Sequence, residues 1–405
     1  MDTTWRGRLL RFNTDVLRFF SRRLSVLGAL AAAGAVGAAG LGFDTGRNME
    51  HQLFTLLASL VVLAGLANSL WRPRLFGTWR VPRHGTAGLP FFAGLAVENR
   101  GRSTERGVEA SAASPGAHAD DVPLPDLPPG GSAAVSVRFL PERRGRLRLG
   151  SPVFLRTDPL GLRRARRAGG EPASVLVLPP RYPVDVLALP GRRRHQPGGV
   201  TLASAVGESQ EFVSLRDYRA GDPLRKIHWR SWAKAGRPIV KECQEEHFVR
   251  HALALDTSGA AGPAFEEAVS VAASFAAGTA APDSLLDLLF VGTQAYCFTS
   301  GRGLGSADGL LEVLAGVEAR PKTPFKELEA SLLRRQGLLS GSILVLLGFD
   351  AERRAFVRRL RAGGLPTLAL AVCAKDSPMW EPEPGVRRID VGDAARGLAS
   401  LGGFS

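Results

Sequence analysis

The stretch HALALDTSGA, from His251 to Ala260, decides the fold of the C-terminal part of the chain. Apart from the histidine, its first five residues are apolar and none favours a turn, which predicts a buried strand that runs up to Asp256. An alanine-rich helix is expected directly afterwards, from Pro263 to Gly278, because proline is favoured in the first helical turn. A strand followed by a helix at this spacing is typical of an α/β domain, which we place at residues 248–405.

The alternation of strands and helices continues towards the C-terminus. Further strands are predicted at residues 285–292, 295–300, 342–349 and 366–373, and further helices at 306–317, 325–335 and 351–362. Strands as apolar as these form a mostly parallel sheet that is covered by helices on both faces. Such sheets bind ligands beyond the carboxyl ends of their strands. Asp256 and Asp350 each follow a predicted strand, so we expect both at that edge.

The preceding part of the chain, residues 80–190, predicts a β-rich module. Short segments that alternate apolar and polar residues, such as 134–139 and 146–149, are separated by clusters of glycine, proline and serine. The proline-rich stretch 121–131 cannot form a central strand. Because this module contains no cluster of histidine, cysteine and carboxylate residues, we expect no catalysis in it.

Two uncharged runs near the N-terminus, Leu24 to Phe43 and Leu53 to Leu70, predict a transmembrane hairpin over residues 24–71. A signal peptide is the alternative for the first run, but a second run follows almost at once without a clear cleavage site. Arginines flank the pair on both outer sides, while the loop between the runs contains only Arg47. By the positive-inside rule, the basic residues 1–23 and the large C-terminal part are expected in the cytoplasm.

The overall charge is strongly basic, with 52 Lys and Arg against 38 Asp and Glu and a formal net charge of +14. This excess fits an acidic partner, such as a nucleic acid, an anionic lipid or an acidic protein face, but also a general bias in composition. The three cysteines are far apart, which argues against a disulfide framework and against a zinc site.

Between the two modules, residues 191–247 form a linker that contains the polar stretch LRDYRAGDPLRKIHWRSWAKAGRPIVKE, Leu215 to Glu242. Asp222 followed by a proline predicts a capped helix that ends at Gly236. Two tryptophans on so polar a helix, Trp229 and Trp232, are expected to pack against a neighbouring segment or domain.

Three functions are open for this stretch. His228 with Asp217 or Asp222 would make an acid–base pair, although no serine or cysteine nucleophile stands in a recognisable elbow. Basic residues interleaved with Tyr218 and the tryptophans suit a nucleic acid, but acidic residues are interspersed with them, as in internal ion pairs. We therefore favour a structural or partner-binding clasp.

The run Asp256-Thr257-Ser258-Gly259-Ala260 resembles the metal-ion-dependent adhesion motif of von Willebrand factor A domains, Asp-x-Ser-x-Ser. The resemblance implies a single Mg²⁺ held by Asp256, Ser258 and Asp350, with Thr323 as a guess for a further ligand. Ala260 replaces the last serine, so the motif is degenerate. The alternative is that Asp256 only caps the loop and helix after it.

As a whole, the chain resembles the domain of unknown function 58 family of membrane-anchored bacterial proteins. The resemblance rests on Arg143 to Leu147, Leu149-Gly150, Asp158 to Leu162, Glu211-Phe212, Leu215, Ile227, Ala233 and ten further signature residues: Arg216, Asp217, Tyr218, Gly221, Asp222, Arg225, His228, Trp229, Lys241 and Glu242. It implies a fold of two N-terminal transmembrane helices, a small antiparallel β module and an α/β von Willebrand factor A-like domain of Rossmann type. It also implies the inner membrane as location, with both termini and the soluble domains on the cytoplasmic side.

The same resemblance implies a function without catalysis. Members of the family are found together with MoxR-type AAA ATPases, so we expect a membrane-anchored protein-interaction module that acts with such an ATPase and a client protein in the assembly or maturation of envelope or other complexes. Mg²⁺ is the only cofactor that the resemblance to the adhesion motif implies. The alternatives are a basic nucleic-acid-binding protein at the membrane and an uncharacterised metal-dependent enzyme.

Overall fold

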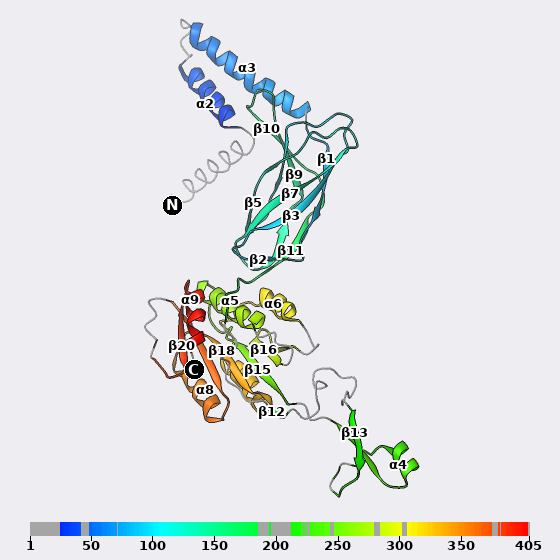
Figure 1. Cartoon of the computed structure of the whole chain (residues 1–405). Coiled ribbons are helices and arrows are strands. Elements are labelled where there is room, and N and C mark those ends of the chain that lie inside the picture. Colours follow the sequence, from blue (N-terminus) through cyan, green and yellow to red (C-terminus); the bar gives the residue numbers. More distant parts are fainter. Residues whose placement is uncertain are drawn as a thin grey trace. The chain divides into compact units, whose positions relative to one another are not determined.

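The computed structural model describes residues 25–41, 48–70, 72–184, 194–195, 212–220, 222, 224, 227–243, 247–278, 284–301, 306–374, 380 and 382–403. The chain divides into two compact units, Met1–Val177 and Leu178–Ser405 (Figure 1). The predicted basic terminus at residues 1–23 lies outside the described residues, as do Gly221 and Arg225.

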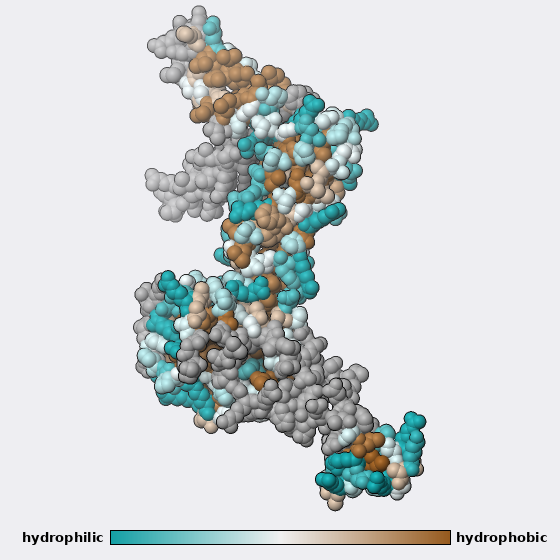
Figure 2. All heavy atoms as spheres, in the orientation of Figure 1, coloured by the Kyte–Doolittle hydropathy of each residue, from teal (hydrophilic) through white to brown (hydrophobic). Residues whose placement is uncertain are grey.

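The first described elements of unit 1 are two helices, α2 (Val26–Leu41) and α3 (Asn48–Leu70), which pack against each other. Apolar residues gather on the surface of both helices (Figure 2). The start of α2 is fixed to a loop of the β module, because the Ser25 amide donates to the Leu162 carbonyl at 2.9 Å. Gly28 allows this close approach, since a Cβ atom built there would lie 1.9 Å from the same carbonyl oxygen.

The predicted membrane spans are not supported by these helices. Helix α2 has 16 residues and extends only about 24 Å at 1.5 Å per residue, which is short of a hydrocarbon core of about 30 Å. Helix α3 is longer, but its first turns contain the exposed polar residues His51 and Gln52. Within the described ranges, no helix is both long and apolar enough to cross a membrane.

Strands dominate the rest of unit 1 and form three sheets. The first has the order β1 (Leu75–Arg80), β3 (Phe91–Asn99), β7 (Ser132–Pro141) and β5 (Ala117–Ala119); the second β10 (Arg164–Ala168), β9 (Pro152–Thr157), β4 (Val108–Ala112) and β6 (Val122–Pro123); the third β2 (His84–Thr86), β11 (Ala173–Leu178) and β8 (Gly145–Leu149). The predicted fold class, a membrane hairpin with a von Willebrand factor A-like domain, is therefore wrong. No described helix can span a membrane, and the first unit consists largely of sheets.

Two of the quoted sequence motifs have structural roles in unit 1. The Asp158 carboxylate accepts hydrogen bonds from the backbone amides of Leu160, at 2.8 Å, and Arg163, at 2.5 Å, which closes a turn. Gly161 completes that turn with a φ of 71°, in the left-handed region that favours glycine. The carbonyl of Gly150 accepts from the Trp79 indole at 3.0 Å, so this motif anchors a core aromatic residue.

Unit 2 is built on a seven-stranded sheet. Its order is β17 (Ala295–Ser300), β16 (Ser284–Val291), β15 (His247–Leu255), β18 (Gly341–Leu347), β19 (Thr367–Cys373) and β20 (Val386–Asp390), and β12 (Arg194–His195) also pairs with β15. The pairs from β16 through β15, β18 and β19 to β20 are parallel, and β17 is an antiparallel edge strand. The strand predicted up to Asp256 is therefore present and ends at Leu255.

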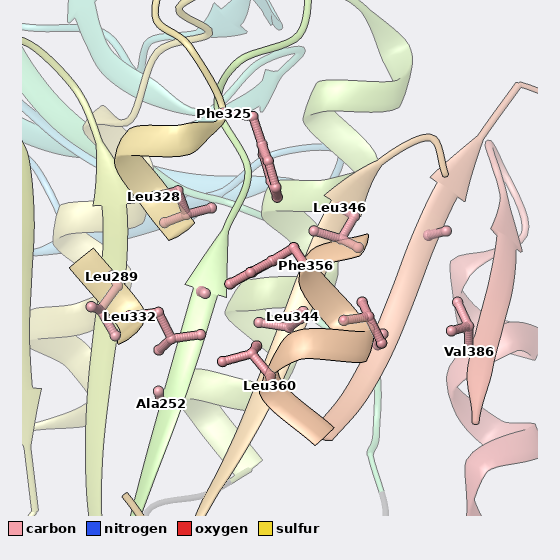
Figure 3. Packing of buried hydrophobic residues seen from close by; sticks show 14 of the residues in the cluster. Ala252, Leu289, Phe325, Leu328, Leu332, Leu344, Leu346, Phe356, Leu360 and Val386 are labelled. Atoms are coloured by element: carbon pink, nitrogen blue, oxygen red, sulfur yellow. The ribbon is translucent and has the colours of Figure 1, made fainter. Parts of the chain in front are cut away.

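Helices cover both faces of this sheet. On one face, α5 (Pro263–Gly278) contacts β15, β18 and β19, and α6 (Ala307–Gly316) and α9 (Ala394–Ala399) pack against α5. On the other face, α7 (Lys326–Leu333) and α8 (Ala351–Ala362) bury apolar residues against the sheet. Phe356 and Leu360 of α8 point towards Leu344 of β18 (Figure 3). The parallel strands thus end at one common edge, where Asp256 and Asp350 follow β15 and β18.

Candidate functional site

The predicted site residues fall into two groups in unit 2. One group, here called the Asp256 cluster, consists of Asp256, Ser258, Asp350 and Arg353 at the carboxyl edge of the sheet. The other, here called the signature arm, consists of β13 (Phe212–Asp217), α4 (Trp229–Ala235), β14 (Ile239–Cys243) and the described residues between them.

Asp256 is the first residue after β15 and is completely buried. Its Oδ1 atom accepts hydrogen bonds from the amide of Ser258 at 2.9 Å and from its hydroxyl at 2.6 Å. Its Oδ2 atom accepts from the amide of Leu347, at the end of β18, at 3.1 Å. The carboxylate therefore caps its own loop and also joins the ends of two neighbouring strands.

A guanidinium group completes this arrangement. Asp350 caps α8, because its Oδ1 atom accepts from the Arg353 amide at 2.9 Å, and this places Arg353 in the first turn. The side chain of Arg353 then donates from Nε to Asp256 at 2.8 Å, from Nη2 to Ser258 at 2.9 Å and from Nη1 to Asp350 at 2.5 Å. The three residues predicted as metal ligands are thus brought together, and they surround an arginine.

The charges of the cluster are largely withdrawn from water. The side chain of Asp256 is 1% exposed and that of Arg353 is 11% exposed. Burial alone would lower the pKa of the Arg353 guanidinium, but the carboxylates of Asp256 and Asp350 outweigh burial and raise it above its ordinary value. Arg353 therefore stays charged, and its cation also lies over the Phe325 ring, 4.8 Å from the centroid.

The donor set does not fit a metal ion while Arg353 is in place. Mg²⁺ binds oxygens at 2.0–2.1 Å in a nearly octahedral shell, and the oxygens that would supply it already accept the guanidinium hydrogens. Ala260 has no side-chain oxygen, and among the described residues no three His, Cys, Asp or Glu side chains gather in a way that could hold a metal. Thr323 lies in the loop before α7, where its amide donates to the Arg320 carbonyl at 3.0 Å. Arg353 was not among the residues predicted from the sequence, although its position three residues after a helix-capping aspartate was the available signal.

The signature arm is a two-stranded antiparallel ribbon that carries a short helix. Strands β13 and β14 pair from Phe212 opposite Cys243 to Asp217 opposite Ile239. Between them, Ile227 bridges to Val240, and these two side chains are buried at 7% and 1% exposure. For Lys241 and Glu242, only the backbone, which lies in β14, is among the described structure.

Asp222 is held by Arg216 and does not cap the helix, contrary to the prediction. Both oxygens of its carboxylate accept from the Arg216 guanidinium, at 2.7 and 2.8 Å, and the Arg219 amide adds a bond at 2.9 Å. These hydrogen bonds lower the pKa of Asp222 from 3.8 to about 2. Helix α4 begins only at Trp229, and it ends at Gly236, which has a φ of 70°, as predicted.

The hypothetical acid–base pair is not formed in the arm. The Nδ1 atom of His228 lies 2.6 Å from the Ser231 hydroxyl, whereas Asp217 binds Arg237 at 3.1 Å and Asp222 binds Arg216. The His228 amide donates to the Ile239 carbonyl at 2.8 Å, so the residue joins the helix to β14. Another signature residue, Tyr218, donates its amide to the Pro238 carbonyl at 3.0 Å. These contacts give His228 and Tyr218 a structural role.

The tryptophans of α4 stack on each other, and Trp229, which was predicted to be covered, is mostly exposed. The rings of Trp229 and Trp232 are stacked with centroids 5.2 Å apart and an angle of 16°. Trp229 is 65% exposed, and helix α4 has no buried residue. Arg230 and Lys234 are exposed on the same helix. Figure 2 shows a small group of strongly hydrophobic residues among hydrophilic ones on the surface of the arm.

Comparisons with known proteins give one match that bears on identity. No curated protein matches the chain. Similar solved structures include a CARDB domain from Pyrococcus furiosus (11% identity, TM-score 0.17, 26% of this chain and 95% of that one), an MSP family member from C. elegans (8%, 0.15, 24% and 93%) and a superoxide reductase, neelaredoxin, from Ignicoccus hospitalis (15%, 0.15, 26% and 82%). TM-scores this low carry no argument about fold or function.

The family comparison matches the second unit. Residues 214–397 match the family described as a protein of unknown function, DUF58. The match includes most of the signature arm and the whole Asp256 cluster, and it leaves the motifs at residues 143–162 outside. Over residues 214–397, the chain is therefore similar to the DUF58 family.

Proposed function

We propose that the chain is a protein-interaction module without catalytic activity, and that its signature arm docks a MoxR-type AAA ATPase. The observation that carries this proposal is the stacked pair of the exposed Trp229 and the half-buried Trp232 on a helix with no fully buried residue. In this role the chain would connect the ATPase to client proteins during the assembly or maturation of protein complexes.

A stacked tryptophan pair with one exposed ring, held on a fixed scaffold, favours a binding surface. A helix of seven residues is too short to be stable alone, and here α4 is held by the bond from His228 to Ile239 and by the bridge between the buried residues Ile227 and Val240. Tryptophan is enriched among the residues that dominate binding energy at protein interfaces. Because the arm holds its aromatic pair in place before binding, less conformational entropy is lost on association.

The charge of the arm indicates the chemistry of the partner surface. Arg216 and Arg237 pair with Asp222 and Asp217 within the arm, whereas Arg230 and Lys234 are exposed beside the tryptophans. A positive rim around an aromatic centre is complementary to an acidic surface with an apolar pocket. We therefore expect an acidic patch on the ATPase.

The test measures the affinity of the full chain for the MoxR-type ATPase of the same organism, in its ATP-bound and ADP-bound states. Trp229→Ala together with Trp232→Ala should weaken binding at least about thirtyfold, the effect of about 2 kcal/mol at a hot spot. Phe92→Ala is the matched control, because it removes a 61% exposed aromatic ring from β3 in unit 1. Equal affinity for all three proteins, or no binding in either nucleotide state, would contradict the proposal.

A further inference from the structure

We propose that the guanidinium group of Arg353 is the permanent cation of the Asp256 cluster and stands where the motif resemblance implies Mg²⁺. The inference concerns the edge of the sheet and does not depend on what the signature arm binds. It states that the cluster is complete in this chain without a metal.

Asp256 requires a cation beside its carboxylate. Its carboxylate is completely buried, and a buried charge is stable only when it is paired or bound to a metal. Arg353 meets this requirement directly, because its Nη2 atom lies 2.7 Å from Oδ2 of Asp256. In a magnesium site the ion would neutralise the same carboxylate, so the two cations exclude each other.

One guanidinium group reaches all three predicted ligands. Mg²⁺ would have joined Asp256, Ser258 and Asp350 through coordination bonds, and the nitrogens of Arg353 join the same three residues at 2.5–2.9 Å. The planar fork of arginine suits several carboxylate and hydroxyl oxygens at once. The ends of β15 and β18 and the start of α8 are thus tied together.

This cation cannot dissociate, since it belongs to the chain. Asp350 positions Arg353 through the helix cap, and Phe325 lies beneath the guanidinium. A bound Mg²⁺ can be removed by a chelator or added as a signal, whereas this cluster keeps one arrangement at every Mg²⁺ concentration. Removing the arginine side chain would leave three hard oxygen donors around a free space, which is the chemistry that divalent cations prefer.

The experiment compares melting temperatures of the full chain in EDTA and in Mg²⁺. Wild type should melt at the same temperature in both. Arg353→Ala should melt lower in EDTA, and Mg²⁺ should then raise its melting temperature by several degrees through binding to the folded state. Arg353→Lys is the matched control, because it keeps a positive charge in the cluster and should not respond to Mg²⁺.

A further variant assigns the response to the cluster. Asp350→Asn combined with Arg353→Ala should lose the Mg²⁺ response, while asparagine still caps α8. The proposal is overturned if Mg²⁺ raises the melting temperature of wild type and Asp350→Asn abolishes that rise. It is also overturned if Arg353→Ala folds and does not respond to Mg²⁺.

Arg353→Ala that fails to fold in EDTA is tested for recovery of folding on addition of Mg²⁺. Recovery supports the proposal. If folding is not recovered, the luminescence of Tb³⁺, a probe for divalent-cation sites, is measured with wild type and Asp350→Asn. Equal signals from the two proteins support the built-in cation, and a wild-type signal that Asp350→Asn removes overturns it.

Discussion

Arg353 and Asp256 are 97 positions apart in the sequence, and their side chains meet at 2.7 Å in a pair that is almost closed to water. The contact joins the first turn of α8 to the loop after β15. It makes the carboxyl edge of the sheet a cross-linked structure, because Ser258 and Asp350 bind the same guanidinium group.

Breaking this pair should destabilise unit 2 strongly. Asp256→Asn and Arg353→Met should each lower the free energy of unfolding by about 3–5 kcal/mol, since each leaves an uncompensated buried charge. The double variant should lose clearly less than the sum of the two. Urea denaturation of the four proteins gives the coupling energy.

A surface pair provides the control for that cycle. Arg396 and Asp393 form an ion pair at 3.6 Å with side chains 87% and 45% exposed, and Asp393→Asn should change the free energy of unfolding by less than about 1 kcal/mol. Equal decreases in the free energy of unfolding for Asp256→Asn and Asp393→Asn would contradict the prediction that burial determines the size of the loss.

Much of the sheet and its edge could be predicted, because local patterns determine them. The run His251 to Leu255 predicted β15, and Pro263 to Gly278 are the observed limits of α5. Asp256 and Asp350 were expected at a common edge, since parallel strands end on the same side. Arg353 was not found in this way, because its contact with Asp256 depends on tertiary packing across 97 positions.

Other predictions were wrong because each rested on one local sequence pattern, while another property of the same segment determined the structure. Hydropathy predicted membrane spans, but the 16 residues of α2 are too few to cross a bilayer. The Asp222-Pro223 pair resembled a helix start, yet both oxygens of Asp222 accept from Arg216 and α4 begins only at Trp229. Trp229 was expected to be covered and is 65% exposed.

Acid should loosen the signature arm over a narrow pH range. The pKa of Asp222 is about 2 in the folded arm and 3.8 ordinarily, so its contribution to stability is complete above about pH 4. That contribution is lost as the pH falls from 3.8 towards 2, because protonation releases Arg216. Hydrogen exchange of the backbone in residues 212–243 should accelerate in this window relative to the intrinsic rate.

The variant Asp222→Asn separates this effect from general acid unfolding. It should show faster exchange in the arm already at neutral pH and no additional acceleration between pH 3.8 and 2. A variant that keeps the wild-type pH dependence would assign the transition to another carboxylate.

The contact between α2 and the β module should depend on Gly28. A Cβ atom there would lie 1.9 Å from the Leu162 carbonyl, so Gly28→Ala should lower the free energy of unfolding by about 1–3 kcal/mol through forced displacement. Gly37→Ala is the matched control on the same helix, because a Cβ atom at Gly37 meets nothing within 4 Å. Thermal denaturation should show Gly37→Ala equal to or more stable than wild type.

Docking by the signature arm is tested most directly by site-specific photocrosslinking. A photoreactive amino acid placed at position 230, beside the exposed Trp229, is irradiated in the full chain with the MoxR-type ATPase and ATP, and position 92 on β3 is the control. We predict a crosslink from position 230 to an acidic segment of the ATPase, lost with Trp232→Ala, and none from position 92. Crosslinks from position 92 but not from position 230 would contradict the account.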